Sequence, residues 1–289
     1  LNIGVAEQNL AGVAAGLASS GKVVFTYSIG NFPTLRCLEH IRNDICYHQA
    51  DVKIVAVGGG MAYGSLGMTH HATEDLAIMR ALPGMEVIAP GDPIETTLAT
   101  RAIVTRPGPC YLRLGKAGEP VVHDEPPPFT VGKALTLSRG SDVTFVSTGG
   151  ILAAAVQAAE QLGQTGLSVG VVSMPTIKPL DADCLRAVAG QCELIVTVEE
   201  HNVIGGLGSA VSEVLVGVHG SQVGLKKVGV QDRFYEEIGS QEYLRAQTGL
   251  TVEQLVNAAE TGLAERRSTN GQPEKPIRKQ RESVTRGKA

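Results

Sequence analysis

The 289-residue sequence has little aromatic material: tryptophan is absent, and Phe, Trp and Tyr together make up 4% of the residues. The apolar share of 43% is therefore mostly Ala, Val, Leu and Ile, which is typical of layered α/β folds and disfavours an all-β sandwich. No apolar run reaches the roughly 18 to 20 residues that a membrane-spanning helix needs, and residues 1–10 lack the layout of a signal peptide. We therefore expect a soluble, cytoplasmic protein that does not bind a membrane.

Cysteines are few, odd in number and far apart; they are Cys37, Cys46, Cys110, Cys184 and Cys192. The sequence has no CxxC motif and no Cys/His cluster at zinc spacing. We expect reduced thiols in the core and no metal site in this chain.

An excess of positive charge is missing from the main body of the chain. The net charge is −4, yet residues 266–289 carry eight basic and two acidic residues, so residues 1–265 are strongly acidic. This balance argues against a nucleic-acid-binding body. Because residues 266–289 also contain almost no apolar side chains, we expect a basic disordered tail, with an electrostatic docking arm as the alternative.

Short β-branched runs alternate with helical patterns along the chain, which predicts parallel sheets covered on both faces. The length suits roughly two domains. The linker His123–Phe129 contains three consecutive prolines and marks their boundary. We therefore predict two doubly wound α/β domains, residues 1–124 and a smaller one at 125–265. The segment Leu1–Val5 reads as a short strand that leads into a helix.

Glu7 is the first candidate for chemistry, because it lies at the mouth of an Ala/Gly-rich helix directly after apolar residues. The structural alternative is a capping charge, since a carboxylate at a helix N-terminus is favoured by the helix dipole. The residue type alone leaves both readings open.

Several ordered blocks of sequence resemble thiamine-diphosphate enzymes of the transketolase type, over about residues 1–262. The blocks are GVAEQNLAGVAAGLASSGKVVFTYSIGNF (4–32), GMTHHATEDLAIMRALPGMEVIAPGD (67–92), PCYLRLG (109–115), TIKPLD (176–181) and EEHNVIGGLG (199–208). The resemblance implies a pyrimidine-binding domain followed by a transketolase C-terminal domain, with thiamine diphosphate as cofactor.

For Glu7, the resemblance implies the glutamate that hydrogen-bonds N1′ of the aminopyrimidine and so promotes loss of the thiazolium C2 proton. Such a carboxyl is expected to be buried, with a raised pKa. Phe32 matches the aromatic position that stacks on the aminopyrimidine, and Tyr27 fits an alternative alignment. Core packing is the structural alternative for both rings.

Thr69-His70 matches the Thr-His pair whose imidazole faces the substrate channel in these enzymes. The resemblance implies that His70 assists proton transfers on substrate oxygens. His71 stands where relatives often have Gln, and it is a further substrate-binding candidate. The alternative for both is a loop histidine that caps the helix starting near Thr73.

Two departures from the family pattern concern the substrate. Leu66 replaces an acidic residue that reads the donor hydroxyls, and Gly58 replaces a second histidine that helps to hold the sugar phosphate. Arg113 in YLRLG matches the family's phosphate-contacting arginine, whose guanidinium suits an oxyanion. We therefore expect a small-molecule sugar substrate outside ordinary pentose-phosphate metabolism.

The family's GDG-to-Asn segment, which binds the diphosphate through Mg²⁺, is missing. Gly91-Asp92 is followed by Pro93 and is interpreted as a turn and helix cap. The resemblance therefore implies that the Mg²⁺ ligands lie on a partner chain of transketolase N-terminal type, with two copies of each chain.

The cluster Glu199-Glu200-His201, followed by the glycines of residues 205–208, does not have the GxGxxG spacing. It is interpreted as a structural strand–turn–helix at the domain interface. The specific role of His201 stays open.

The best account of these features is the C-terminal subunit of a split transketolase-like enzyme, which transfers a two-carbon ketol unit from a ketose or ketose phosphate to an aldehyde. One alternative is the beta subunit of a 2-oxo acid dehydrogenase. Another is a non-catalytic scaffold or regulatory subunit. The particular sugar, and whether the chain is naturally separate, are left open by the sequence.

Overall fold

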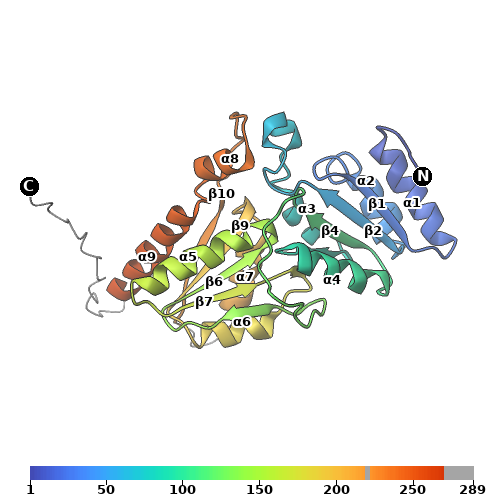
Figure 1. Ribbon diagram of the computed structural model, residues 1–289. Helices are drawn as coiled ribbons and strands as arrows, with labels where there is room; N and C mark the ends of the chain where they lie inside the picture. The colour runs from blue at the N-terminus through green and yellow to red at the C-terminus, as the bar shows by residue number, and fades with distance from the viewer. Residues whose placement is uncertain (219–221, 270–289) are drawn as a thin grey trace, which may run out of the picture.

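The computed structural model describes residues 1–218 and 222–269. Within these ranges the chain forms two α/β units that lie side by side, the N-terminal unit in blue to green and the C-terminal unit in yellow-green to red (Figure 1). The expected α/β class and two-domain arrangement are confirmed, and none of the described helices is long and apolar enough to cross a membrane.

The first sheet has the strand order β1-β2-β4-β3-β8. Its strands are β1 (Val24–Ile29), β2 (Val52–Val57), β4 (Cys110–Leu114), β3 (Glu86–Ile88) and β8 (Thr176–Lys178). The covering helices are α1 (Glu7–Ser19), α2 (Leu38–His40) with the π-helical turn Ile41–Cys46, α3 (Asp75–Ala81) and α4 (Pro93–Val104). Strands β1 to β4 are parallel to their neighbours, whereas β8 comes from the second unit and pairs antiparallel with β3. The sheet is therefore mixed, and the two units share it.

The second sheet has the order β10-β9-β6-β7-β5. Its strands are β10 (Gly224–Val230), β9 (Leu194–Asn202), β6 (Val143–Thr148), β7 (Val169–Ser173) and β5 (Leu135–Ser138), and β5 is the antiparallel edge. The helices are α5 (Leu152–Gln164), α6 (Ala182–Ala189), α7 (Leu207–Val216), α8 (Gln241–Thr248) and α9 (Val252–Thr269). Both sheets are thus parallel in the middle and antiparallel at one edge.

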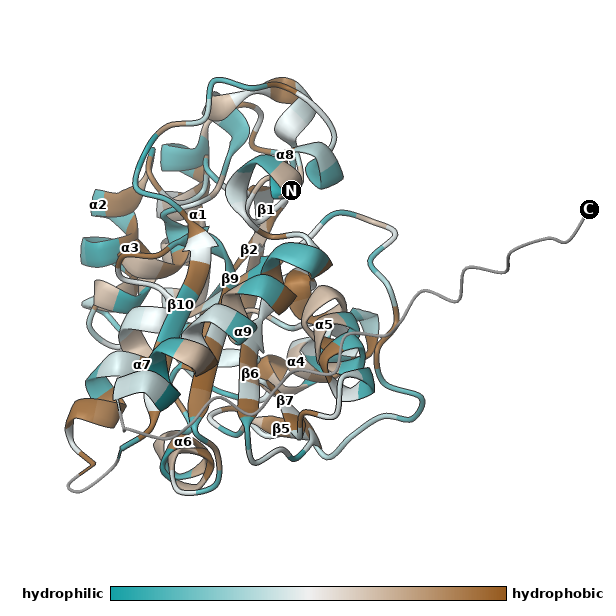
Figure 2. Cartoon of the chain, turned by 90° about the vertical axis from the view of Figure 1, so that its left-hand side faces the viewer, coloured by the Kyte–Doolittle hydropathy of each residue, from teal (hydrophilic) through white to brown (hydrophobic). Residues whose placement is uncertain are grey.

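Apolar side chains fill the space between each sheet and its helices. In Figure 2 the hydrophobic colours gather on the strands of the second sheet, and the outward turns of α9 are hydrophilic. Fully buried residues such as Phe145, Leu162 and Val196 make up this core, and β-branched and alanine residues allow close packing of helix on sheet. The five cysteines are free thiols.

Two expected element boundaries are wrong. Leu1–Val5 is not a strand: no neighbouring strand pairs with it in the described chain, and Leu1 and Val5 are 98% and 92% exposed. At the other end α9 continues to Thr269, beyond the expected start of the tail at residue 266. It continues because Arg267 is buried against Glu193 and Asp142, with nitrogen–oxygen distances of 2.8 and 2.5 Å. Residues 270–289 lie outside the described residues.

Candidate functional site

Glu7 is the first residue of α1, and its side chain points to the carboxyl-terminal half of β1. The residue is 7% exposed. Its Oε1 accepts a hydrogen bond from Ser28 Oγ at 3.3 Å, and its Oε2 accepts from Arg36 Nη1 at 2.6 Å. Glu7 is therefore a buried carboxylate with an ion-pair partner at one edge of the sheet.

The pKa of Glu7 differs from the expectation. Burial raises it, but hydrogen bonds from its own backbone N–H, from Arg36 and from Ser28 outweigh burial and hold the pKa below its usual value. The expected raised pKa is wrong for this chain, because no feature of the sequence indicated that Arg36 would reach the carboxyl.

Phe32 and His70 meet next to this ion pair. Their rings pack edge to face, with centroids 5.1 Å apart and an interplanar angle of 75°. The Arg36 guanidinium carbon lies 4.9 Å from the Phe32 ring centroid, a cation–π contact. Glu7, Phe32 and His70, three candidates that are far apart in the chain, therefore converge, and Arg36 joins them.

The turn after β1 holds this group together. Asn31 donates its side-chain amide to the Thr69 carbonyl at 2.9 Å, which ties the Phe32 turn to the short helix Met68–His70. Thr69 Oγ1 lies 3.0 Å from His70 Nδ1, so the threonine of the pair fixes the imidazole that follows it. Sequence reasoning missed Arg36 because it lies in an irregular turn, where no periodicity indicates its direction.

His71 points into the protein, unlike its neighbour. It is 6% exposed, and its Nε2 is buried without a hydrogen-bond partner among the described residues. Burial lowers the pKa of His71 despite the nearby carboxylates of Glu74 and Glu200. His71 is therefore a neutral interior histidine behind the His70 imidazole.

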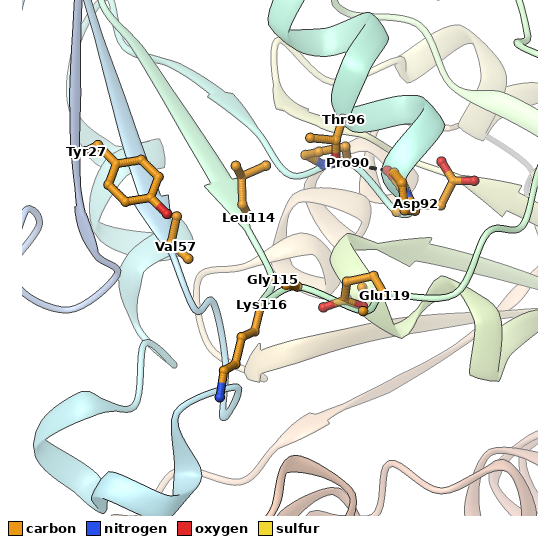
Figure 3. Close-up of a pocket in the computed structure, with 14 residues that line it drawn as sticks. Tyr27, Val57, Pro90, Asp92, Thr96, Leu114, Gly115, Lys116 and Glu119 are labelled. Carbon is orange, nitrogen blue, oxygen red and sulfur yellow. Dashed lines mark hydrogen bonds between the residues drawn. The ribbon is translucent and has the colours of Figure 1, made fainter.

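Tyr27 lies on the other face of β1, since neighbouring residues of a strand point in opposite directions. It is 70% exposed and lines a separate cavity of about 370 Å³, together with Leu114, Lys116 and Glu119 (Figure 3). The structure does not bring Tyr27 to Glu7, so of the two aromatic candidates only Phe32 shares the Glu7 site.

Arg113 is 4% exposed, and its donors are engaged inside the protein. Its Nε donates to Asp75 at 2.8 Å, and its Nη2 donates to the Ala72 and Glu200 carbonyls at 2.8 and 2.9 Å. These contacts do not support the expected phosphate-binding role. A more accessible cation nearby is Lys116, whose Nζ lies 5.3 Å from the Tyr63 ring centroid and which extends from the cavity wall in Figure 3.

The departures at Leu66 and Gly58 have a structural setting. Leu66 is 52% exposed, on the loop that leads to His70. Gly58 has a φ of +86°, and a Cβ there would lie 2.1 Å from the Tyr63 ring. A histidine cannot replace Gly58 while Tyr63 covers it, so this part of the pocket is reshaped.

One group of potential metal ligands occurs in the described ranges, Asp92, Glu95 and His123, with ligand atoms within 4.8 Å of one another. Asp92 caps α4 by accepting from Glu95 N at 2.7 Å, and its other oxygen accepts from the backbone N–H groups of His123 and Val122. Glu95 accepts from Gly91 N at 2.6 Å and contacts His123 Nε2 at 2.8 Å. These oxygens are already engaged, and the cap interpretation of Gly91-Asp92 is confirmed.

The Glu199–His201 segment is the last part of β9. Glu199 accepts the backbone N–H groups of Leu207 and Gly208 at 2.6 and 2.8 Å and so caps α7. His201 is fully buried, and its Nε2 accepts from Ala77 N at 3.2 Å, in the first turn of α3. These contacts support the interpretation of this segment as a structural interface.

Comparison with known proteins agrees with this geometry. The family model "Transketolase, pyrimidine binding domain" matches residues 1–118, and "Transketolase, C-terminal domain" matches residues 132–255. One of the two subunits of the apulose-4-phosphate transketolase of Actinobacillus succinogenes is 34% identical, over 90% of this chain and 83% of its own length. The chain belongs to the transketolase family.

Two further transketolases support this membership. The 6-deoxy-6-sulfo-D-fructose transketolase subunit of a Clostridium species is 39% identical, over 90% of this chain and 80% of its own length. A solved structure described as a split gene transketolase, inactive beta4 tetramer, is 41% identical with a TM-score of 0.85, covering 92% of this chain and 85% of its own. The chain is thus a transketolase-type subunit, and neither the 2-oxo acid dehydrogenase nor the scaffold alternative is favoured.

Membership in the transketolase family implies dependence on thiamine diphosphate. The residues of this chain fit the aminopyrimidine end of that cofactor, because a buried carboxylate and an aromatic ring flank one edge of the sheet. They do not fit the diphosphate end, since the acidic group at α4 is occupied by backbone N–H groups within the described residues.

Proposed function

We propose that this chain is the C-terminal subunit of a split transketolase that moves a two-carbon ketol unit from a ketose to an aldehyde. The convergence of Glu7, Phe32 and His70 at one edge of the first sheet carries the proposal. A scaffold has no physical use for a buried carboxylate, an aromatic platform and an imidazole in one place.

Each of the three side chains has a task in this reaction. Glu7 holds a proton against the pyrimidine nitrogen once Arg36 has turned away, and Phe32 supports the pyrimidine ring. Bound thiamine diphosphate supplies the nucleophilic carbon that receives the two-carbon unit. His70 moves protons at the hydroxyl and carbonyl oxygens of the substrate, a task that suits an imidazole near neutral pH.

The missing half of the site comes from a partner chain of transketolase N-terminal type. That partner supplies the Mg²⁺ ligands and the diphosphate contacts, because Mg²⁺ is bound through a few carboxylate oxygens together with the phosphates. Two copies of each chain around a two-fold axis give each site residues from both kinds of subunit.

The substrate is proposed to be a ketose that carries an anionic group and lies outside the ordinary pentose phosphates. The names of two similar subunits specify a phosphate and a sulfonate sugar. In this chain Lys116 offers a cation at the cavity near the Tyr63 loop, and burial raises the pKa of the neighbouring Glu119, which reduces its negative charge. Leu66 replaces the hydroxyl-reading acid, so selection of donor hydroxyls is altered.

The test is a direct comparison of donors. The chain is mixed with its partner subunit, thiamine diphosphate and Mg²⁺, and is given either a ketose or pyruvate. Release of an aldehyde from the ketose is the expected result. Release of CO₂ from pyruvate, without cleavage of any ketose, would instead support a 2-oxo acid dehydrogenase.

A further inference from the structure

The histidine pair lies at the end of a closed loop, residues 60–72, which we call the His70 loop. Its two ends form an antiparallel bridge: Gly60 N donates to Ala72 O at 2.9 Å, and Ala72 N donates to Gly60 O at 2.8 Å. His70 lies two residues before this closure. The position of the His70 imidazole therefore depends on what holds the bridge.

Glu200 of the second domain contacts both strands of the bridge. Its Oε1 accepts from Met61 N at 2.7 Å, and its own carbonyl receives the Arg113 guanidinium that also donates to Ala72 O. Glu200 is 4% exposed, and a Cβ at Gly60 would lie 2.6 Å from its side chain. Gly60, with a φ of +65°, is thus the residue type that permits this close approach.

Helix α8 completes the attachment. Arg245 donates to Glu200 Oε2 at 2.7 Å, and Gln241 Nε2 lies 3.0 Å from each carboxylate oxygen, so the buried charge is paired and hydrogen-bonded. At the far end of the His70 loop, Gly64 accepts from Gly239 N at 3.3 Å and packs against Leu244 of α8. The cyan turn of the loop lies beside α8 in Figure 1.

We propose that Glu200 is a positioning residue for the transferase site: it fixes the His70 loop from the second domain and so sets the place of the His70 imidazole. The inference rests on the proposed role of His70. It gives the second domain a function in the reaction, since a displacement of about 1 Å in a reacting group can lower a rate about a hundredfold.

The test compares Glu200→Ala with Glu199→Ala, using the full chain. Both glutamates are buried neighbours on β9, but Glu199 caps α7 and does not contact the His70 loop. Hydrogen exchange of the isolated chain is measured over residues 58–75, and the kinetics of ketose cleavage are measured after the partner subunit is added.

Glu200→Ala is expected to speed exchange at the Met61 and Ala72 amides and to lower kcat by about ten- to hundredfold, with cofactor affinity unchanged. Glu200→Gln, which retains an oxygen to accept from Met61 N, should restore most of kcat. Equal exchange and equal kcat in Glu200→Ala and Glu199→Ala would overturn the proposal. Faster exchange in Glu200→Ala, with no ketose cleavage even by the wild-type complex, would show that the loop attachment holds and that the proposed function fails.

Discussion

At the scale of single residues, Arg36 gives the Glu7 site its present state. One guanidinium pairs with the Glu7 carboxylate and lies on the Phe32 ring, the two groups expected to receive the aminopyrimidine. A bound pyrimidine must therefore displace Arg36 from both. Because the Arg36 side chain is 44% exposed, it can turn into solvent without leaving a buried charge.

The first prediction concerns Glu7 itself. Glu7→Gln keeps the size of the side chain but removes the acidic proton, so turnover in the reconstituted enzyme should fall by roughly 10² to 10⁴. Initial rates of ketose cleavage measure this effect, with the exposed Glu39→Gln as a control that should retain activity. A Glu7→Gln enzyme with wild-type turnover would remove the catalytic assignment.

The second prediction concerns the ion pair. The Glu7 pKa lies below its usual 4.5, so the carboxylate adds stability above that pH and loses it as the pH falls through the folded-state pKa. Arg36→Met should raise the Glu7 pKa and weaken this acid dependence. Carbon-13 NMR titration of the glutamates measures the pKa, and Arg42→Met, at an exposed arginine, is the matched control. An unchanged Glu7 titration would show that Arg36 does not hold the carboxyl in solution.

At the scale of elements, the start of α4 joins the linker to the first domain. Asp92 and Glu95 bind the linker backbone and the His123 imidazole. A short acidic cluster that has the composition of a metal-ligand set is thus a helix cap that holds the chain between the domains.

The third prediction follows from this contact. The hydrogen bond to Glu95 raises the pKa of His123 above its usual 6.5, in spite of partial burial. His123⁺ therefore adds stability that is fully present below pH 6.5 and is lost as the pH rises through the folded-state pKa. His123→Gln should lower stability on the acidic side and flatten the profile. Urea unfolding between about pH 5.5 and 8.5 tests this, and parallel profiles would contradict it.

Several elements could be predicted because their signals are local. The run Cys110–Leu114 is β4 as expected, since a β-branched and aromatic segment between turn residues has few alternatives. The cap at Asp92 was also readable, because Pro follows it at the first helical position.

The parts that could not be predicted depend on contacts far apart in sequence. The three-residue strand β8 crosses into the first sheet, and nothing in its own length or composition indicates a partner. Arg113 fitted the family pattern, but its direction is decided by Asp75 and by the second domain. The site residues came from the resemblance, and the sequence could not show that Arg36 would occupy their meeting point.

At the scale of the whole molecule, the two domains are joined firmly while one face of the first sheet stays open. Strand β8 and Glu200 link the domains, whereas Val23, Phe25 and Tyr27 alternate along the edge strand β1 and the residue before it, with exposures of 46%, 41% and 70%. Alternate apolar residues of this kind on an edge strand are typical of a surface that a partner covers.

The central claim is that this chain supplies the pyrimidine half of a shared cofactor site. Calorimetric titration of the isolated chain with thiamine diphosphate and Mg²⁺ tests it most directly, followed by the same titration after the partner subunit is added. Tight binding and ketose cleavage should appear only in the mixture, because the diphosphate has no ligands among the described residues of this chain. Micromolar binding at one site per isolated chain, with ketose cleavage and no second polypeptide, would contradict the account.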